Sequence, residues 1–260
     1  MTFQYTPISG FQKSSFTAAS STGQQITHDV YRRGAGAPII LIQELPGIGK
    51  ETLRLADRFI DAGFEIVLPH LFGPLEKTSI AGNVARMFCM RKEFALFASD
   101  KSSPIVGWLK ALCNDIRTAT GARGVGVIGM CLTGNFALSL IGDDSVLAAV
   151  SAQPAMPFHQ QNALHMSNEE VSNAKHGIDN SAAMHAFRFA GDKLSTAKKF
   201  QCIHDRFNTD GKERVKLTTL PGKGHSVFTL DFVDEEGHPT RQALDSILAY
   251  FNTQLQPQPG

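Results

Sequence analysis

The chain lacks an excess of either charge, and it has few cysteines. Its 25 Lys and Arg face 24 Asp and Glu, which leaves a net charge of +1. Such a balance is not typical of proteins that bind nucleic acid or an anionic membrane surface. Only Cys89, Cys113, Cys131 and Cys202 are present, and no two have the C-x-x-C spacing of a zinc site. These spacings also argue against a disulfide-stabilised secreted scaffold.

Signals for export and for metal binding are absent as well. Met1 to Gly10 has neither a basic start nor an apolar core, so the sequence predicts no secretory signal and a cytoplasmic location. Neither H-E-x-x-H nor D-x-D-x-D-G occurs, so we expect no metal site and no cofactor. The remaining class of partner is a small-molecule substrate. Oligomeric state is left open.

One segment could be mistaken for a membrane span or a nucleotide site. Residues 124–142 contain no charged side chain, but they are rich in glycine and include several polar residues. The spacing of Gly124, Gly126 and Gly129 matches the dinucleotide-binding fingerprint. That fingerprint must follow a strand, whereas these glycines lie within one. We therefore expect neither a membrane span nor nucleotide binding, and the segment needs another explanation.

Strand and helix patterns alternate along the chain, with an unpatterned start at 1–25 and irregular stretches at 70–103 and 154–175. Strands are predicted near 26–32, 39–42, 64–68, 125–128, 146–150, 186–190 and 215–220. Helices are predicted near 53–60, 105–116, 136–141, 196–207 and 241–251. This alternation favours an α/β fold with a doubly wound, mostly parallel sheet and helices on both faces. We expect a single domain over 26–254, a loose lead-in over 1–25 and a tail over 255–260.

The uncharged segment contains a turn suited to a nucleophile. After the strand at 125–128 the sequence reads Gly129-Met-Cys131-Leu-Thr-Gly134 and then continues into a helix. This is a glycine-flanked elbow with cysteine in place of serine and one extra residue before the last glycine. The elbow places Cys131 at the start of a helix, whose dipole favours negative charge. We interpret Cys131 as a nucleophile; the alternative, a small buried core residue, is preferred for the other three cysteines.

A cysteine nucleophile needs a base, and the base needs an acid to orient it. His225 follows Gly222 and Gly224 in a loop after a predicted strand, and these glycines let the loop fold the imidazole back over the sheet. Asp192 directly follows another predicted strand, at the edge where catalytic residues gather in such sheets. His185, His204 and His238 have weaker contexts. The alternative for Asp192 is a turn or helix-capping residue.

With these residues in view, the sequence resembles the dienelactone hydrolases of the α/β-hydrolase fold. Three segments carry the likeness: Leu41–Gly47, which reads LIQELPG, the elbow at 129–134, and the loop at 221–226, which reads PGKGHS. Their order and spacing match from about residue 26 to 253. The resemblance implies a Cys131, His225 and Asp192 triad.

The same resemblance implies roles for further residues. Glu44 would be an extra carboxylate near the nucleophile that helps to activate the thiol. The backbone N–H groups of Leu45 and Leu132 would stabilise an oxyanion. Because Glu44 follows a buried strand, we also expect its pKa to be perturbed.

The sequence departs from the family pattern around the substrate. Met130 and Thr133 replace the usual tyrosine and second glycine of the elbow, and Thr229 stands where the archetype has an arginine that grips a substrate carboxylate. Arg86 and Arg91 are candidates for that role, and Trp108 for the pocket lining. These departures make a dienelactone a doubtful substrate.

The resulting hypothesis is a hydrolase that opens esters or lactones by acyl transfer to Cys131. Two other readings remain. Cys131 could be an oxidisable thiol without turnover, or the chain could be a non-catalytic binding member of the fold, because a fold alone does not fix a function.

Overall fold

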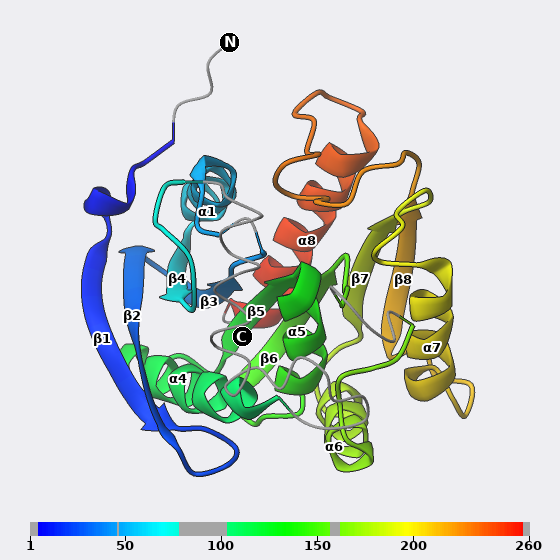
Figure 1. Ribbon diagram of the computed structural model, residues 1–260, viewed down its shortest axis with the longest axis horizontal. Coiled ribbons are helices and arrows are strands. Elements are labelled where there is room, and N and C mark those ends of the chain that lie inside the picture. The colour runs from blue at the N-terminus through cyan, green and yellow to red at the C-terminus, as the bar shows by residue number, and fades with distance from the viewer. Residues whose placement is uncertain (1–4, 46, 78–102, 157–161, 257–260) are drawn as a thin grey trace.

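The computed structural model describes residues 5–45, 47–77, 103–156 and 162–256. Eight strands form one sheet in the order β1-β2-β4-β3-β5-β6-β7-β8 (Figure 1). They are β1 (Gln12–Ala19), β2 (Gln25–Gly34), β3 (Ala37–Ile42), β4 (Phe64–His70), β5 (Val125–Met130), β6 (Val146–Ala152), β7 (Met184–Phe189) and β8 (Val215–Leu220). From β4 to β8 all neighbours are parallel, whereas β1 and β2 add to the β4 edge in antiparallel pairs. The α/β architecture with a mostly parallel sheet is thereby confirmed.

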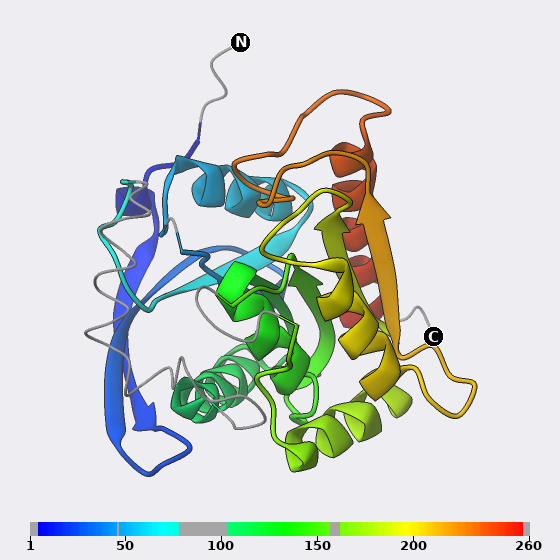
Figure 2. The ribbon, with the colours of Figure 1, turned by 45° about the vertical axis from the view of Figure 1, so that its right-hand side comes forward.

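Helices cover both faces of the sheet (Figure 2). One face packs against α1 (Lys50–Asp61) and α8 (Pro239–Leu255). The other packs against α4 (Pro104–Thr120), α5 (Gly134–Leu140), α6 (Asn168–Asp179) and α7 (Ala197–Phe207). Side chains of the central strands β3 and β5 are buried on both sides because helices lie above and below them. Within the described residues, no helix is both long and apolar enough to cross a membrane.

Two elements depart from the sequence-based expectation. The lead-in at 1–25 was expected to be loose, but Gln12–Ala19 forms β1, paired with β2 along its whole length. Most β1 side chains are exposed, so the strand carries no clear apolar alternation for a sequence pattern to reveal. Helix α6 falls in a stretch expected to be irregular. Its start is marked by a capping box between Ser167 and Glu170, a signal that the apolar periodicity alone did not expose.

The parallel topology gathers the ends of the strands that matter for function. Because β3, β5, β6, β7 and β8 run parallel, the residues that follow them all lie at one edge of the sheet. Glu44, Cys131, Gln153, Asp192 and His225 each follow one of these strands within five residues. In open α/β sheets, ligands bind at this edge.

Candidate active site

Cys131 occupies a strained turn between β5 and α5. Its φ is +58°, which is in the left-handed region that a residue with a Cβ rarely adopts. The turn is possible only because its neighbours are small. A Cβ on Gly129 would lie 2.1 Å from the carbonyl oxygen of Thr133, and one on Gly134 would lie 3.0 Å from that of Ala152. A strained, buried cysteine at this position fits the geometry of a nucleophile elbow.

Thr133, which departs from the family pattern, ties the elbow to the neighbouring strand. Its Oγ1 accepts a hydrogen bond from the Met130 N–H at 2.8 Å. The same hydroxyl lies 3.1 Å from the carbonyl of Gln43 and 3.3 Å from that of Ile42, at the end of β3. A glycine could not make these contacts. The hydroxyl therefore couples the position of the thiol to the segment that carries Glu44.

His225 and Asp192 form a hydrogen-bonded pair. Nδ1 of His225 lies 2.8 Å from Oδ2 of Asp192, which is buried. Burial lowers the pKa of His225, but hydrogen bonds to Asp192 and to the Cys131 thiol outweigh it and raise the pKa to about 10. Since Nδ1 faces Asp192, Nε2 is the nitrogen left for the thiol. Nε2 is buried and has no hydrogen-bond partner of normal geometry in the described part of the chain, but the Cys131 thiol is near enough to act on the pKa of the imidazole. The structure thus brings Cys131, His225 and Asp192 together.

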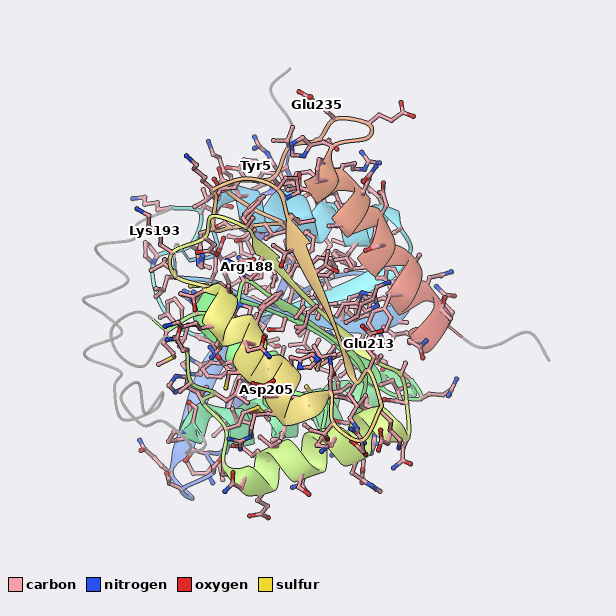
Figure 3. All side chains as sticks on the ribbon, turned by 90° about the vertical axis from the view of Figure 1, so that its right-hand side faces the viewer. Tyr5, Arg188, Lys193, Asp205, Glu213 and Glu235 are labelled. Carbon is pink, nitrogen blue, oxygen red and sulfur yellow. The ribbon has the colours of Figure 1, made fainter. Side chains whose placement is uncertain are left out.

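The loops that carry this pair are held by their own hydrogen bonds. Oδ1 of Asp192 accepts from the N–H groups of Leu194 and Ser195 at 2.8 and 3.0 Å. Arg188 is a residue of β7 (Figure 3); its guanidinium lies over the ring of Phe200 in α7 and donates to the carbonyls of Ser195 and Ala190 at 2.7 and 3.1 Å. The backbone around Asp192 is therefore fixed from both sides.

The His225 loop is fixed in a similar way. Asp231 accepts the N–H groups of His225 and Ser226 on one carboxylate oxygen, at 2.8 and 2.9 Å. A Cβ on Gly224 would approach the carboxyl carbon of Asp231 to 2.7 Å. The glycine is thus needed for the close approach that holds the loop, in addition to any turn that it permits.

Glu44 is buried at the end of β3 among neutral hydrogen-bond partners. Ser226 Oγ donates to its Oε2 at 2.9 Å and Gln153 Nε2 donates to the same oxygen at 3.3 Å, while Thr229 Oγ1 donates to Oε1. Burial raises the pKa of Glu44, although these bonds and the nearby His225 act in the opposite direction. A carboxylate without a bonded cation in a buried site is poised to change its protonation state.

The remaining predicted residues lie apart from this cluster or outside the described residues. Arg86 and Arg91 are outside them. Trp108 is fully buried on α4, where its ring packs edge-on against Phe16 of β1 and His28 of β2. The structure therefore places Trp108 in the core packing of α4 against the antiparallel edge. In the described residues, no group of three or more potential metal ligands is found.

Leu45 directly follows Glu44, and Leu132 directly follows the candidate nucleophile Cys131. Leu132 follows Cys131 in the short 3-10 turn Cys131–Thr133 and is buried, and Leu45 follows Glu44 and packs against the core. Both backbone N–H groups thus belong to residues at the correct edge of the sheet. Their role as oxyanion donors stays a prediction.

Sequence reasoning missed the three partners of Glu44. Gln153 follows β6 directly, which is the same strand-end signal that identified Asp192, but no base or nucleophile chemistry drew attention to an amide. In the sequence, Ser226 stands out only as part of the loop motif, and Thr229 only as a departure from the family pattern.

Comparison with known proteins decides the family. The family model described as the dienelactone hydrolase family matches residues 30–255. The chain belongs to the dienelactone hydrolase family. This membership supports a hydrolase acting on a small molecule, in agreement with the resemblance seen in the motifs. No curated protein matches the chain significantly.

Solved structures with the same fold include other family members and esterases. The dienelactone hydrolase from Anabaena variabilis aligns with a TM-score of 0.60 and 14% identity, covering 94% of this chain and 100% of its own. A cold-adapted esterase from an Arctic intertidal metagenomic library aligns with a TM-score of 0.59 and 14% identity over 95% of each chain. A lidless α/β serine hydrolase from Xanthomonas campestris gives 0.56 and 12%, over 95% and 97%. At these identities the likeness shows the α/β-hydrolase fold alone.

Proposed function

We propose that this member of the dienelactone hydrolase family hydrolyses carboxylic ester or lactone bonds of a small molecule, with Cys131 as nucleophile. The observation that carries the proposal is the imidazole of His225 between Asp192 and the thiol of Cys131, at a turn that is strained at the nucleophile. Enzymes retain such backbone strain where it presents a reacting group. The raised pKa of His225 supports an imidazolium that is stabilised by its interactions with Asp192 and Cys131.

The proposed reaction has two halves. In the first, the thiolate of Cys131 attacks the carbonyl carbon, and the tetrahedral oxyanion accepts hydrogen bonds from the N–H groups of Leu45 and Leu132. Each such donor contributes about 3 kcal/mol to the transition state. His225 then gives its proton to the leaving alkoxide oxygen as the carbon–oxygen bond breaks, which leaves a thioester on Cys131.

In the second half, water replaces the alcohol. Neutral His225 takes a proton from the water, the resulting hydroxide attacks the thioester carbonyl, and the acid departs as the carbon–sulfur bond breaks. Asp192 holds the imidazole in one orientation and stabilises its charged form. Glu44 is proposed to assist removal of the proton from the thiol, as the resemblance to the family implies.

The partners of Glu44 bear on the substrate class. Thr229 replaces the carboxylate-gripping arginine of the family archetype, and its hydroxyl is already engaged by Glu44. A substrate carboxylate next to Thr229 would lie close to the carboxyl group of Glu44, and residue 229 would supply no cation to offset the two charges. We therefore expect neutral esters and lactones to be turned over faster than anionic ones.

The test is hydrolysis of small aryl esters and lactones by the intact protein and by Cys131→Ala. We expect the variant to lose activity to the background level, because the covalent half-reaction has no nucleophile. Cys202→Ala is the matched control, since Cys202 is a half-buried cysteine of α7, and it should keep the wild-type rate. A wild-type rate in Cys131→Ala contradicts the proposal. So does rapid oxidation of Cys131 to a sulfenic acid in a protein that hydrolyses none of the substrates.

A further inference from the structure

Gln153 has an unusual backbone at the end of β6. It is fully buried and directly follows the last residue of the strand, and its φ is +36°, which is unfavourable for a residue with a Cβ. Its own N–H donates to the carbonyl of Phe187 in β7 at 2.7 Å, which holds the backbone in this conformation. Among the described residues, the other non-glycine positions with positive φ are Glu76, Cys131 and Asp210. Strain of this kind persists where the surroundings fix it, often at a functional site.

The side chain of Gln153 joins two segments that are far apart in the sequence. Its Nε2 donates to Oε2 of Glu44 at 3.3 Å, and its Oε1 accepts from the N–H of Val227 at 3.3 Å. Val227 lies two residues after His225. One amide therefore links the end of β3 to the loop that carries the imidazole.

Few other side chains could make this link. The link needs a donor at one end and an acceptor at the other, in a side chain long enough to reach both and free of charge in a buried site. Glutamate would supply the acceptor but place a second carboxylate against Glu44, and methionine would fill the space without either bond. The shorter amide of asparagine lacks one methylene.

The hydrogen bond that Gln153 donates to Glu44 matters because, within the ranges that the structure describes, no cation is bonded to this carboxyl group. Its three bonded partners are neutral, and His225 is the titratable group whose charge acts on it; Cys131 and Asp192 act on the same imidazole. The orientation of the carboxyl group relative to His225 thus depends on neutral hydrogen bonds. Ser226 and Thr229 belong to the segment that follows His225, whereas Gln153 reaches this segment from the end of β6 and accepts from its backbone at Val227.

We propose that Gln153 is a positioning residue that fixes the Glu44 carboxyl group relative to His225. This inference rests on the proposed hydrolase function. The strained backbone at the end of β6 aims the amide, and the amide sets both the orientation of Glu44 and the place of the His225 loop. Gln153 thereby holds Glu44 and the His225 loop in a fixed position relative to each other.

The main test compares Gln153→Met and Gln153→Glu with the wild-type protein in steady-state hydrolysis over a range of pH. We expect kcat to fall roughly 10- to 100-fold in Gln153→Met, with a smaller change in KM, because misplacement of a catalytic group acts on the chemical step. Loss of the donor disfavours ionised Glu44, so the acid limb of the pH profile should move to higher pH. In Gln153→Glu it should move further, because two adjacent carboxyl groups share a proton.

Two further measurements separate positioning from a structural role. In a Glu44→Gln background, neither substitution should move the pH profile further. Gln153→Gly and Gln153→Ala both remove the side chain, but only glycine relieves the strained backbone, so the glycine variant should melt no lower than the alanine variant while kcat falls in both. Gln201→Met is the matched control, because Gln201 is an exposed glutamine on α7 that bonds to Asp205 at 2.7 Å, and it should leave both kcat and the pH profile unchanged.

The outcomes distinguish this inference from the function beneath it. If the wild-type protein is active but Gln153→Met keeps its kcat and pH profile, the positioning role is wrong and the hydrolase remains. If Gln153→Met lowers the rate equally at all pH values and lowers the melting temperature in parallel, the residue is structural only. If the wild-type protein hydrolyses no ester or lactone, the proposed function fails first. In that case the pH dependence of Cys131 alkylation by iodoacetamide still tests whether Gln153→Met alters the site.

Discussion

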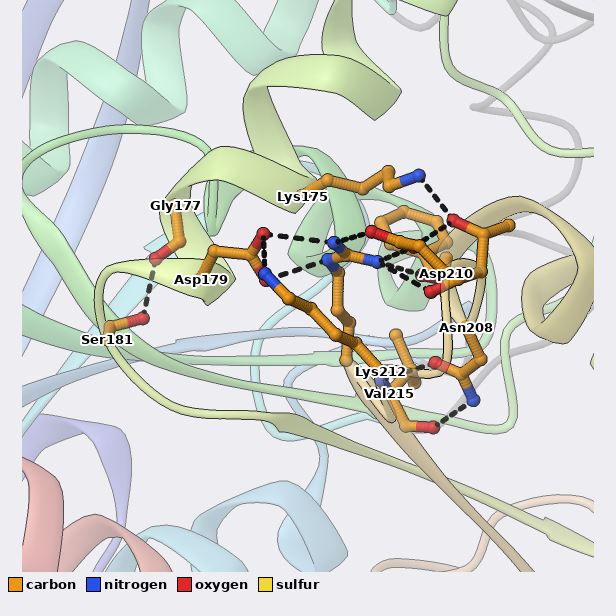
Figure 4. Close-up of polar contacts among 11 residues, drawn as sticks. Lys175, Gly177, Asp179, Ser181, Asn208, Asp210, Lys212 and Val215 are labelled. Atoms are coloured by element: carbon orange, nitrogen blue, oxygen red, sulfur yellow. Dashed lines mark hydrogen bonds and ion pairs between the residues drawn. The ribbon is translucent and has the colours of Figure 1, made fainter.

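Two groups of carboxylates in this molecule, one around Arg214 and one near His225, show opposite shifts in the pKa of a carboxyl group. In the first, Asp179 at the end of α6 and Asp210 in the turn before β8 (Figure 4) both bond to the guanidinium of Arg214. Its guanidinium donates to Asp179 and Asp210 at 2.8–2.9 Å, and Lys212 adds a contact to Asp179 at 3.0 Å. Hydrogen bonds from Arg214 hold the pKa of both carboxyl groups below the usual range, at about 2 for Asp179. We refer to these four residues as the Arg214 clamp.

The second cluster is the candidate active site. There the cation is an imidazolium, which can lose its proton, and Glu44 bonds only to neutral donors. The pKa of Glu44 is raised by burial, and that of His225 is raised to about 10 by its bonds to Asp192 and Cys131. A carboxylate paired with a permanent cation keeps one charge state and stabilises the fold. A carboxylate without one can exchange a proton, which is what acid–base catalysis needs.

The largest contrast is expected from Asp192→Asn. The variant keeps the shape of the side chain but no longer stabilises the imidazolium of His225, so kcat/KM should fall on the order of 10³- to 10⁴-fold. The measurement is hydrolysis of the best ester or lactone found in the screen. If Asp192→Asn keeps more than a tenth of the wild-type rate, the carboxylate of Asp192 is not needed for catalysis and the contrast with the Arg214 clamp is wrong.

A smaller and opposite effect is expected from Arg214→Met. Two carboxylates would lose their common cation, and the backbone carbonyls of Phe207 and Thr209 would lose a donor. We expect the melting temperature to fall by more than about 4 °C, with kcat unchanged. The control is Lys212→Met, an exposed partner of the same carboxylate, which should change the melting temperature little. If Arg214→Met lowers kcat at temperatures where it is folded, the clamp and the site are coupled.

The smallest effects are expected in the pH dependence of thermal unfolding, on opposite sides of neutrality. The lowered pKa of Asp179 gives stability that is present above its ordinary value of 3.8 and is lost as the pH falls through about 2. The raised pKa of His225 gives stability that is present below 6.5 and is lost as the pH rises through about 10. Arg214→Met should flatten the acid side only, and Asp192→Asn the alkaline side only. The reverse assignment would show that the wrong groups were identified.

Much of the fold was predictable because its signals are local. The seven strands and five helices inferred from the sequence all occur in the structure, with somewhat different ends. β1 was not predicted because it is an exposed edge strand whose side chains give no alternating pattern, and its position depends on pairing with β2. The elbow could be read from Gly129 to Gly134 since its chemistry lies within six residues.

The site was only partly predictable because its members come from distant segments. Asp192 and His225 could be selected by their places after strands, and the structure pairs them. Trp108 was a plausible pocket residue by composition, but helix packing turns it toward Phe16 and His28. No motif around Gln153 in the sequence indicates that its side chain bonds to Glu44 and to the backbone of Val227.

The sequence by itself determined seven of the strands and five of the helices, the glycine-flanked turn around Cys131 and the kinds of side chain at the strand ends. These depend on interactions among neighbours in the chain. Only the tertiary structure decided which of those side chains meet. Ser226, Thr229 and Gln153 lie more than 100 residues from Glu44 in sequence, and the parallel register of the sheet brings all three onto one buried carboxyl group. Burial then raises the pKa of that group, and burial is a property of the packed chain that no short segment contains.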